Sequence, residues 1–330
     1  CRVRHVPGFR AIDGVELVSV CNSTRESSER AAKEFNIPNV YDNWLDLIQS
    51  DDTDAICIGT WPYLHCPMTL AVLEANKHVL TEARMALDVD EARSMLAISR
   101  TKPDLVAQIV PAPFTLKFDE TIRNLISDGY LGDIVALDLR GNSSSFVDLD
   151  GPLHWRQNRN LSGYNILNMG IWYECLMRWV GPASSVQAMM KVNVKHRRDE
   201  EGLIQSISVP DHVDILCDMV CGAQAHLSFS AVTGLGRSQE AWLYGSKGTL
   251  HLDMGAGILK GGQKGDSGLE EIKIDKNSVG GWRVEEEFIR AIRGEEKITH
   301  TSFDDGVSYM EFTEAVTRSA QNSTVVALPL

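Results

Sequence analysis

The sequence lacks several features that would place it among membrane, nucleic-acid-binding or repetitive proteins. Its 330 residues contain no run of about 18 apolar residues, so no transmembrane helix is expected. Acidic residues outnumber basic ones by 45 to 32, and the net charge of -13 argues against duplex nucleic acid, because phosphate binding needs clustered Lys and Arg. No repeat and no low-complexity segment is present.

Cysteine usage gives no sign of a disulfide framework or of a redox or zinc pair. The seven cysteines are odd in number, and most lie in apolar runs, where a thiol behaves as a small hydrophobic group. Cys217 and Cys221 are four positions apart, which is the wrong spacing for a C-x-x-C motif. We therefore expect reduced thiols and a cytoplasmic protein. The chain opens on Cys1 instead of Met and shows no signal peptide, which leaves export open.

Metal ligands and a serine nucleophile are not indicated either. Ser143 to Ser145 lack the G-x-S-x-G context of a hydrolase. Six histidines show no paired metal-ligand spacing, so we expect no bound metal: His78, His196, His212, His226, His251 and His300.

The first hundred residues alternate between strand and helix patterns. Val15 to Cys21 is an apolar run, and Glu26 to Phe35 follows it with helical spacing. Further strands are expected at 55–59, 79–80 and 104–110, and further helices at 68–75 and 88–99. This alternation predicts βαβ units and a parallel sheet.

The pattern changes near Pro111 to Pro113. Phe118 to Ser127 is an amphipathic helix, and Ile134 to Arg140 begins a series of longer strands. Antiparallel strands are expected at 184–193, 212–219, 223–231, 240–244 and 249–253, with helices at 166–180, 283–293 and 305–319 and a last strand at 325–328. The change of pattern predicts a domain boundary after residue 111. The glycine-rich stretch Gly255 to Gly268 opens no helix, so it favours a flexible hairpin loop over a phosphate cradle.

Six short motifs follow one another along nearly the whole chain. They are Gly59-Thr60-Trp61-Pro62-Tyr63-Leu64-His65, Lys77-His78-Val79-Leu80-Thr81-Glu82, Asp128-Gly129-Tyr130-Leu131-Gly132-Asp133-Ile134, Trp155-Arg156, Tyr244-Gly245-Ser246-Lys247-Gly248-Thr249-Leu250 and Trp282-Arg283-Val284-Glu285-Glu286-Glu287-Phe288. Each is weak alone, but in this order and spacing they resemble the Gfo/Idh/MocA family of oxidoreductases.

The resemblance implies a fold, an activity and an assembly. The expected fold class is an α/β Rossmann domain (1–111, dinucleotide binding) followed by an α+β domain (112–330, substrate binding and oligomerisation) with an open-faced, mainly antiparallel sheet. That sheet commonly serves as the subunit interface in the family, so a homo-oligomer is expected. The implied reaction is hydride transfer between a nicotinamide cofactor and a sugar, polyol or related carbinol.

The start of the chain does not show the glycine-rich turn that receives a dinucleotide pyrophosphate. Arg2 to Phe9 fits the helix and loop that would follow such a turn. We therefore expect about a dozen residues, with the first strand and the turn, to precede this sequence. On that expectation this chain alone binds dinucleotide poorly.

Two groups of residues are predicted to bind the cofactor. Where the family has an acidic side chain for the adenosine ribose, this chain has Asn22-Ser23-Thr24-Arg25, which favours NADP(H) over NAD(H) because these groups would accept a 2′-phosphate. The alternative is that the four residues only cap the next helix. Thr60, Trp61 and His65 follow a strand, where ligands bind in open α/β sheets, and Glu82 matches the Glu of the family's Glu-Lys-Pro. Trp61 could equally be a domain-interface aromatic.

The usual catalytic residues of the family are replaced. Glu82-Ala83-Arg84 stands where Glu-Lys-Pro is expected, and Asn168-Met169-Gly170-Ile171-Trp172 stands where Asp-x-Gly-x-His is expected. The Lys, Asp and His are thus lost, and neither Asn nor Trp serves as a base.

Three interpretations of this replacement remain open. In the first, catalysis is rebuilt with Arg84 as the cation and His154 or Tyr173 as the proton-transfer group, although His154 could be a surface residue and Tyr173 a core residue. In the second, a retained cofactor supports redox-assisted elimination or glycoside cleavage. In the third, the protein is a non-catalytic binding or regulatory protein. Aromatic faces suit sugar C–H surfaces, so the predicted substrate-binding residues are Trp155, Arg156, Asn168 and Trp172.

Overall fold

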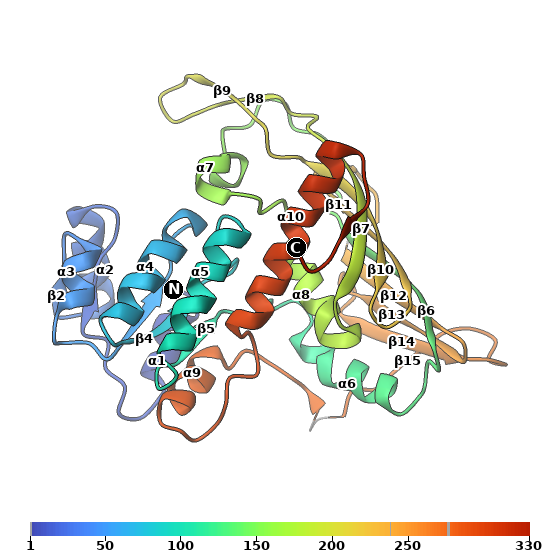
Figure 1. The fold of residues 1–330 in the computed structure, drawn as a ribbon, viewed down its shortest axis with the longest axis horizontal. Coiled ribbons are helices and arrows are strands. Elements are labelled where there is room, and N and C mark those ends of the chain that lie inside the picture. Colours follow the sequence, from blue (N-terminus) through green and yellow to red (C-terminus); the bar gives the residue numbers. More distant parts are fainter. Residues whose placement is uncertain (1, 238, 276–277) are drawn as a thin grey trace. The chain divides into compact units, whose positions relative to one another are not determined.

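The chain folds into two compact units in the computed structural model, which describes residues 2–237, 239–275 and 278–330 (Figure 1). Unit 1 comprises Cys1–Pro111 and Arg283–Val307, and unit 2 comprises Ala112–Trp282 and Ser308–Leu330. The first boundary falls where the sequence pattern changes. The expected ranges 1–111 and 112–330 were continuous, however, whereas the chain returns to unit 1 after Trp282.

The strands of unit 1 are short and parallel. β1 (Ser19–Val20) pairs with β2 (Asn39–Val40). β3 (Ala55–Ile58), β4 (His78–Thr81) and β5 (Ala107–Ile109) form a second parallel sheet in that order. The βαβ pattern read from the sequence is therefore confirmed.

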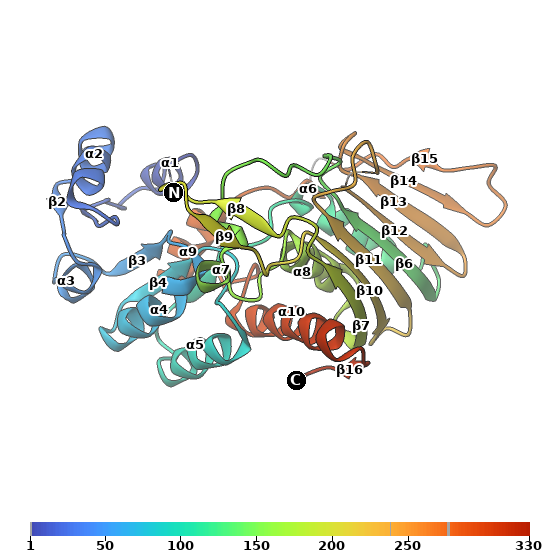
Figure 2. The ribbon, with the colours of Figure 1, turned by 90° about the horizontal axis from the view of Figure 1, so that it is seen from above.

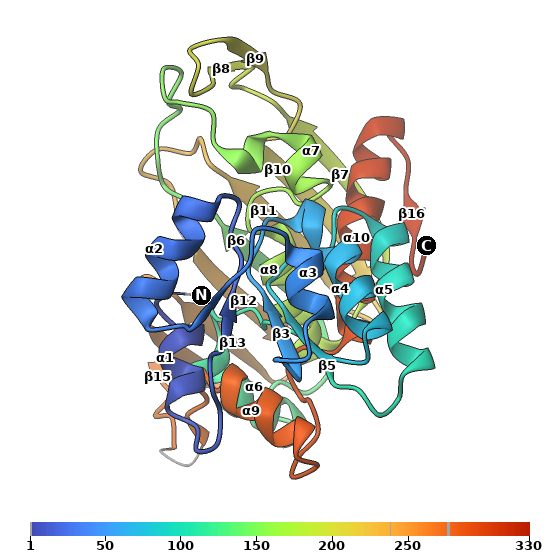
Figure 3. The same cartoon turned by 90° about the vertical axis from the view of Figure 1, so that its left-hand side faces the viewer.

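Helices lie on both sides of β3 in unit 1. Figure 3 shows α1 and α9 on one side and α4 and α5 on the other. Strands buried on both faces are typical of parallel sheets, and residues such as Ile58 and Leu80 are almost fully buried. The helical elements of this unit are α1 (His5–Arg10), α2 (Arg25–Phe35), α3 (Trp44–Gln49), the short 3₁₀ helix η1 (Pro62–Leu64), α4 (His65–Glu74), α5 (Val89–Thr101) and α9 (Val284–Ile292).

The returning segment belongs to unit 1 because it completes the apolar packing there. On α9, Val284 and Phe288 are buried. The ring of Phe288 meets the ring of Phe9 on α1 edge-on, with 6.3 Å between the ring centroids. A local sequence pattern shows that α9 is amphipathic, but it cannot show which unit the apolar face covers.

Unit 2 is built on a nine-stranded sheet. Its strands in spatial order are β15 (Glu270–Glu271), β14 (Ile258–Gln263), β13 (Gly248–Asp253), β12 (Gln239–Gly245), β6 (Ile134–Gly141), β11 (Gln224–Ser230), β10 (His212–Met219), β7 (Ala183–Lys191) and β16 (Val326–Ala327). β6 and β11 pair in parallel, and the other neighbours pair antiparallel. The predicted fold class, a Rossmann domain followed by a mainly antiparallel open sheet, is confirmed.

Helices cover one face of this sheet and leave the other face open (Figure 2). The covering helices are α6 (Leu116–Ser127), α8 (Met169–Val180) and the part of α10 (Phe303–Asn322) that belongs to unit 2. Leu139, Leu227 and Leu243 are buried beneath them, whereas Asp138 and Arg140 alternate with the buried residues and point to the open face. Four small elements complete the unit: η2 (Trp155–Gln157), α7 (Arg159–Ser162), β8 (His196–Arg198) and β9 (Ile204–Ser206).

The expectation of a flexible loop over Gly255 to Gly268 is wrong for its middle part. Residues 258–263 form β14, and Lys260 pairs with His251 of β13. Gly261 and Gly262 have no room for a side chain: a Cβ on Gly262 would lie 2.8 Å from the carbonyl oxygen of Gly268, and one on Gly261 would lie 2.5 Å from the side chain of Ile272. Glycine reads as a loop signal in sequence, and here it marks a close backbone approach.

No helix within the described ranges is long and apolar enough to cross a membrane.

A buried ionic cluster joins α6 to α8. Arg178 on α8 lies 2.9 Å from Asp119 of α6 and 2.9 Å from Glu174, and its guanidinium also donates to the carbonyl oxygen of Ala112 at 3.0 Å. Trp179 Nε1 donates to the same Asp119 at 2.7 Å. The carboxylate of Asp119 thus satisfies two buried groups at once.

Replacing Asp119 should therefore destabilise unit 2 strongly. Asp119→Ala leaves the Arg178 charge and the indole N–H of Trp179 without this partner, and breaking a buried pair in this way costs about 3–5 kcal/mol. Urea unfolding followed by tryptophan fluorescence measures the loss. Glu120→Ala, an exposed position on the same helix, should change stability by less than about 0.5 kcal/mol. Equal losses in the two variants would contradict the assigned role of Asp119.

Candidate functional site

In unit 1 the predicted cofactor-binding residues follow the carboxyl ends of β1, β3 and β4. The ends of β3 and β4 are tied together, because the backbone N–H of Glu82 donates to the carbonyl oxygen of Ile58 at 3.0 Å. This edge of a parallel sheet is where ligands bind in open α/β folds. Trp61 is 45% exposed, which leaves much of its side chain at the surface, and the Oγ1 atom of Thr60 is buried without a partner among the described residues. An unpartnered buried hydroxyl at this edge fits a site for a polar ligand.

The four residues Asn22 to Arg25 make the contacts of a helix cap. The Thr24 side chain accepts from the backbone N–H of Ser27, and Asn22 Nδ2 donates to the Ser27 carbonyl oxygen at 3.0 Å. Arg25 pairs with Glu29 at 2.7 Å and with Asp42 at 3.3 Å. Its side chain is nevertheless 52% exposed, and Ser23 is exposed as well. In the absence of a cofactor, the contacts seen for these residues are therefore those of the capping alternative. The Arg25 side chain nevertheless stays accessible from solvent.

His65 is fully buried, and both of its ring nitrogens face backbone oxygens. Nδ1 lies 2.8 Å from the carbonyl oxygen of Arg84, and Nε2 lies 3.0 Å from that of Thr60. Burial outweighs these contacts and lowers the pKa of His65 below its ordinary value. The ring thus ties the segment after β3 to the segment after β4. The sequence analysis counted His65 among the cofactor-binding residues, and in the structure both of its ring nitrogens face backbone oxygens of the protein.

Glu82 is held by a histidine that sequence reasoning missed. His5, the first residue of α1, lies with Nε2 3.0 Å from Glu82 Oε1 and with Nδ1 2.5 Å from Glu285 Oε1. Burial alone would lower the pKa of His5, but the two carboxylates outweigh it and raise the pKa. Glu285 is 280 positions from His5, so no local pattern could have paired them.

Arg84, predicted to be the catalytic cation, is also in unit 1. It is 5% exposed, and its carbonyl oxygen is the one that faces His65. Its guanidinium is therefore not a surface charge, and it acts on a ligand only if that ligand reaches a buried position.

Several buried polar atoms of unit 2 have no hydrogen-bond partner among the described residues, and three of them lie at the predicted substrate-binding positions or beside Gly141. These three are Oδ1 of Asn168, Nε1 of Trp172 and Oδ1 of Asn142. Asn168 Oδ1 lies against Gly141, because a Cβ on that glycine would be 3.0 Å from it, and Asn142 is the next residue after Gly141. Trp172 stands one helical turn after Asn168. Since nearly all buried polar groups in folded proteins are hydrogen-bonded, these atoms indicate a binding site for a polar ligand.

Asn142 did not emerge from the sequence. The available signal was its position directly after the predicted strand 134–140, where a polar residue ends an alternating pattern. Such a residue usually opens a loop, so position alone did not distinguish a ligand contact from a turn.

His154, Trp155 and Arg156 form a contiguous group at η2. The Arg156 guanidinium lies 4.3 Å from the centre of the Trp155 ring, and the His154 ring centroid lies 5.7 Å from it. His154 Nδ1 accepts the backbone N–H of Arg156 at 3.2 Å, so the hydrogen-bond pattern assigns the proton of the neutral ring to Nε2. Burial and the neighbouring Arg156 lower the pKa of His154. In this arrangement the imidazole is a neutral donor at Nε2, which suits holding a hydroxyl oxygen better than removing its proton.

Tyr173 does not face a ligand, contrary to its predicted role as a proton-transfer group. Its hydroxyl accepts the backbone N–H of Ala183 at 2.8 Å, and its ring stacks on Phe312 at 3.6 Å between centroids. Burial raises the pKa of Tyr173. The core alternative is the correct one, because neighbouring helix positions point in different directions and here Tyr173 faces α10.

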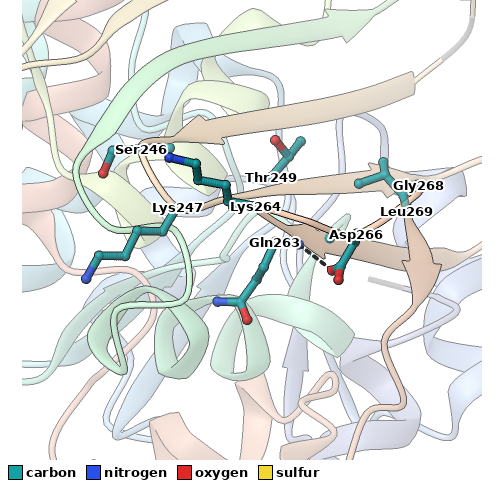
Figure 4. A pocket seen from close by; sticks show the side chains of 11 residues that line it. Ser246, Lys247, Thr249, Gln263, Lys264, Asp266, Gly268 and Leu269 are labelled. Atoms are coloured by element: carbon teal, nitrogen blue, oxygen red, sulfur yellow. Dashed lines mark hydrogen bonds between the residues drawn. The ribbon is translucent and has the colours of Figure 1, made fainter.

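A separate hollow of about 290 Å³ lies at the far strands of the sheet in unit 2 (Figure 4). Glycine-rich turns line it, together with Lys247 and Lys264. The backbone N–H of Lys264 donates to the carbonyl oxygen of Lys247 at 2.8 Å, and Gln263 N donates to Asp266 at 2.7 Å. These amides serve the turns themselves and no helix begins here, so the hollow lacks the features of a phosphate cradle.

Among the described residues, no group of three or more His, Cys, Asp or Glu side chains is arranged to hold a metal ion.

Comparison with known proteins matches both units to one family. Residues 2–109 match the family model described as "Oxidoreductase family, NAD-binding Rossmann fold", and residues 120–251 match the "GFO/IDH/MocA C-terminal domain". An uncharacterised oxidoreductase of Synechocystis sp. is 22% identical over 75% of this chain and 67% of its own length. The trans-1,2-dihydrobenzene-1,2-diol dehydrogenase of Mus musculus is 25% identical over 72% of this chain and 66% of its own length.

A solved structure supports the same fold. The structure of levoglucosan dehydrogenase in complex with NADH and L-sorbose superposes with a TM-score of 0.84 at 20% identity. The superposition covers 98% of this chain and 95% of that one. At this identity the likeness extends to the fold of the whole chain and no further.

The core assignment of Tyr173 predicts a variant that loses stability and keeps its activity. Tyr173→Phe leaves the buried N–H of Ala183 without its acceptor, which should lower the free energy of unfolding by about 1–3 kcal/mol. Thermal and urea unfolding measure this loss. If Tyr173 moved the proton instead, the maximal rate would fall by about 10²-fold or more, and such a drop would restore its catalytic role.

Proposed function

Because the chain belongs to the Gfo/Idh/MocA family of oxidoreductases, we propose that it transfers a hydride between a nicotinamide cofactor and a sugar, polyol or related carbinol. The observation that supports this most is the group of unpartnered buried polar atoms on Asn142, Asn168 and Trp172. An amide offers both donors and acceptors, and an indole N–H is a donor. Hydroxyl groups both donate and accept, so a polyhydroxylated substrate satisfies such a site.

The names of two similar proteins point to the same chemistry. One is a dehydrogenase of a trans-dihydrodiol, and the other is a levoglucosan dehydrogenase whose structure holds a sugar. We propose a substrate with neighbouring hydroxyl groups for this chain as well. Trp155, with Arg156 across its face, offers a second surface for the C–H side of a ring.

The residues of this chain position the hydroxyl, and the nicotinamide ring accepts or supplies the hydride when the cofactor is bound. We propose that His154 Nε2–H donates to the reacting oxygen, and Arg84 of unit 1 stays the predicted catalytic cation. The positions of the family's Lys, Asp and His carry Ala83, Asn168 and Trp172, none of which titrates near neutral pH. The group that accepts the hydroxyl proton is therefore not at these three positions.

We propose that NADP(H) is favoured over NAD(H). No carboxylate occupies positions 22 to 25, so the repulsion that excludes a 2′-phosphate is absent there. The exposed Arg25 can exchange its ion pairs with Glu29 and Asp42 for a phosphate, since exposed ion pairs contribute little.

We also propose a homo-oligomer that pairs through the open face of the sheet in unit 2. This face carries both signs of charge, which a two-fold contact between identical surfaces requires. Asp138 pairs with Arg140 at 2.8 Å, and His251 lies 3.1 Å from Glu240 and stacks on Trp242. A cytoplasmic location stays a prediction.

The cofactor proposal is tested by fluorescence titration of NADPH and NADH. The protein should bind NADPH more tightly, and Arg25→Ala should raise the Kd for NADPH about tenfold while leaving that for NADH unchanged, because only the former has a 2′-phosphate. Arg30→Ala, exposed on the same helix, is the matched control. If Arg25→Ala raised the Kd values for NADPH and NADH equally, the proposed role of Arg25 in NADP(H) preference would be wrong. When the family's first strand and glycine-rich turn are added before residue 2, failure of the folded protein to bind either nucleotide would refute the oxidoreductase proposal.

The substrate proposal is tested with two tryptophans that differ in their N–H partners. A screen of sugars and polyols identifies the substrate. Trp172→Phe should then raise KM about three- to tenfold; it should lose stability only through the cavity that the smaller ring leaves, because its N–H has no protein partner to lose. Trp179→Phe should instead lower stability and leave KM unchanged, since the N–H of Trp179 donates to Asp119. If Trp172→Phe leaves KM unchanged, Trp172 does not contact the substrate.

A further inference from the structure

The segment that returns to unit 1 brings a buried carboxylate against the residue that holds Glu82. We infer that Glu285 is a positioning residue for Glu82: acting through the imidazole of His5, it fixes the Glu82 carboxylate at the carboxyl end of β4. Its relevance to the cofactor rests on the proposed function. The contact chain itself lies wholly within unit 1.

The three side chains form a line from the interior to the surface. Glu285 and His5 are buried, whereas the side chain of Glu82 is 31% exposed. The distances are 2.5 Å from Glu285 Oε1 to His5 Nδ1 and 3.0 Å from His5 Nε2 to Glu82 Oε1. The Oε1 atom of Glu82 is therefore held by the buried His5, while part of the carboxylate stays accessible to solvent at the end of β4.

The backbone of α1 leaves room for this arrangement. A Cβ on Gly8 would lie 2.7 Å from the carboxyl carbon of Glu285, so a side chain there would displace the carboxylate. The rings of Phe9 and Phe288 pack between the same two helices. Packing thus sets the distance between α1 and α9, and Glu285 uses that fixed distance to orient His5.

The protonation state of His5 decides whether both contacts hold. A neutral imidazole donates from one nitrogen, whereas the imidazolium donates from both. Despite burial, the two carboxylates raise the pKa of His5, and the His5 contact lowers the pKa of Glu82 against the opposing effect of burial. His5 is therefore charged over a wider pH range than an ordinary histidine.

Two other titratable side chains near this line, Cys57 and His65, stay neutral. Burial raises the pKa of the Cys57 thiol on β3 to about 12. Burial lowers the pKa of His65 on α4, in spite of the nearby Glu82. Of these five side chains, only His5, Glu82 and Glu285 therefore carry charge.

The direction of the pH dependence follows from these shifts. The folded pKa of His5 lies above its ordinary 6.5, so its contribution is complete below pH 6.5 and is lost as the pH rises through the folded value. The folded pKa of Glu82 lies below its ordinary 4.5, so its contribution is complete above pH 4.5 and is lost as the pH falls through the folded value. Glu82 is therefore held most firmly between pH 4.5 and pH 6.5, and it is released as the pH rises through the folded pKa of His5.

The decisive experiment compares Glu285→Gln with Glu286→Gln. The first variant keeps the shape of the buried side chain and removes its charge. The second removes a half-exposed carboxylate on the same helix, which pairs with Arg283 and Arg290. NMR titration should show the pKa of His5 falling by about one unit or more in Glu285→Gln and staying unchanged in Glu286→Gln. An unchanged His5 pKa in Glu285→Gln would overturn the proposal.

Two readouts test whether Glu82 follows His5. The carboxyl carbon resonance of Glu82 should show a step at the His5 pKa, and this step should move to lower pH in Glu285→Gln; this readout needs no cofactor. The pH at which NADPH or NADH affinity declines should move by the same amount, a shift that general destabilisation does not produce.

The absence of a step in the Glu82 resonance would overturn the positioning role. Failure of cofactor binding alone would overturn the proposed function and leave the NMR test decisive. If Glu285→Gln does not fold, Glu82→Gln should lower the His5 pKa in the same way.

Discussion

The packing of α9 against α1 is the constraint on which unit 1 depends. A parallel sheet must be covered on both faces, and here one cover comes from the start of the chain and from a segment almost 300 residues later. The contact between Phe9 and Phe288 is ordinary apolar packing, but it places Gly8 beside the carboxylate of Glu285. The same contact that closes the core therefore also assembles the ionic line that ends at Glu82.

The substrate groups proposed in unit 2 act through hydrogen bonds. Asn168 and Trp172 carry buried polar atoms without a partner among the described residues, and His154 Nδ1 accepts the backbone N–H of Arg156, which leaves Nε2 to donate. Under the proposed function, such groups orient substrate hydroxyls and do not remove their protons.

Local pattern predicted most of the fold, and it failed where distant contacts decide. The helix expected at 118–127 and the strand expected at 134–140 are present as α6 and β6, because their apolar residues recur with the period of a helix and of a strand. β14 was missed because its glycines carry no side chain to show that period. Trp172 and Tyr173 are adjacent on one helix and both are buried, and only their contacts tell them apart: the Tyr173 ring stacks on Phe312, whereas the Trp172 ring lies 5.7 Å from that of Phe114. His5 and Glu285 have no relation in sequence at all, so their contact could only come from the structure.

Unit 1 contains two buried histidines whose surroundings drive them to opposite charge states. His65 faces two carbonyl oxygens, whose partial charges do not overcome the cost of burial, and its pKa falls. His5 faces two carboxylates, whose full charges do overcome that cost, and its pKa rises. Burial is thus common to both, and the partner decides the outcome. His65 can tie two segments together at any pH near neutrality, whereas His5 ties Glu82 only while it keeps its second proton. At this edge of the sheet, the contacts of His65 therefore do not change with pH near neutrality, whereas the contact between His5 and Glu82 does.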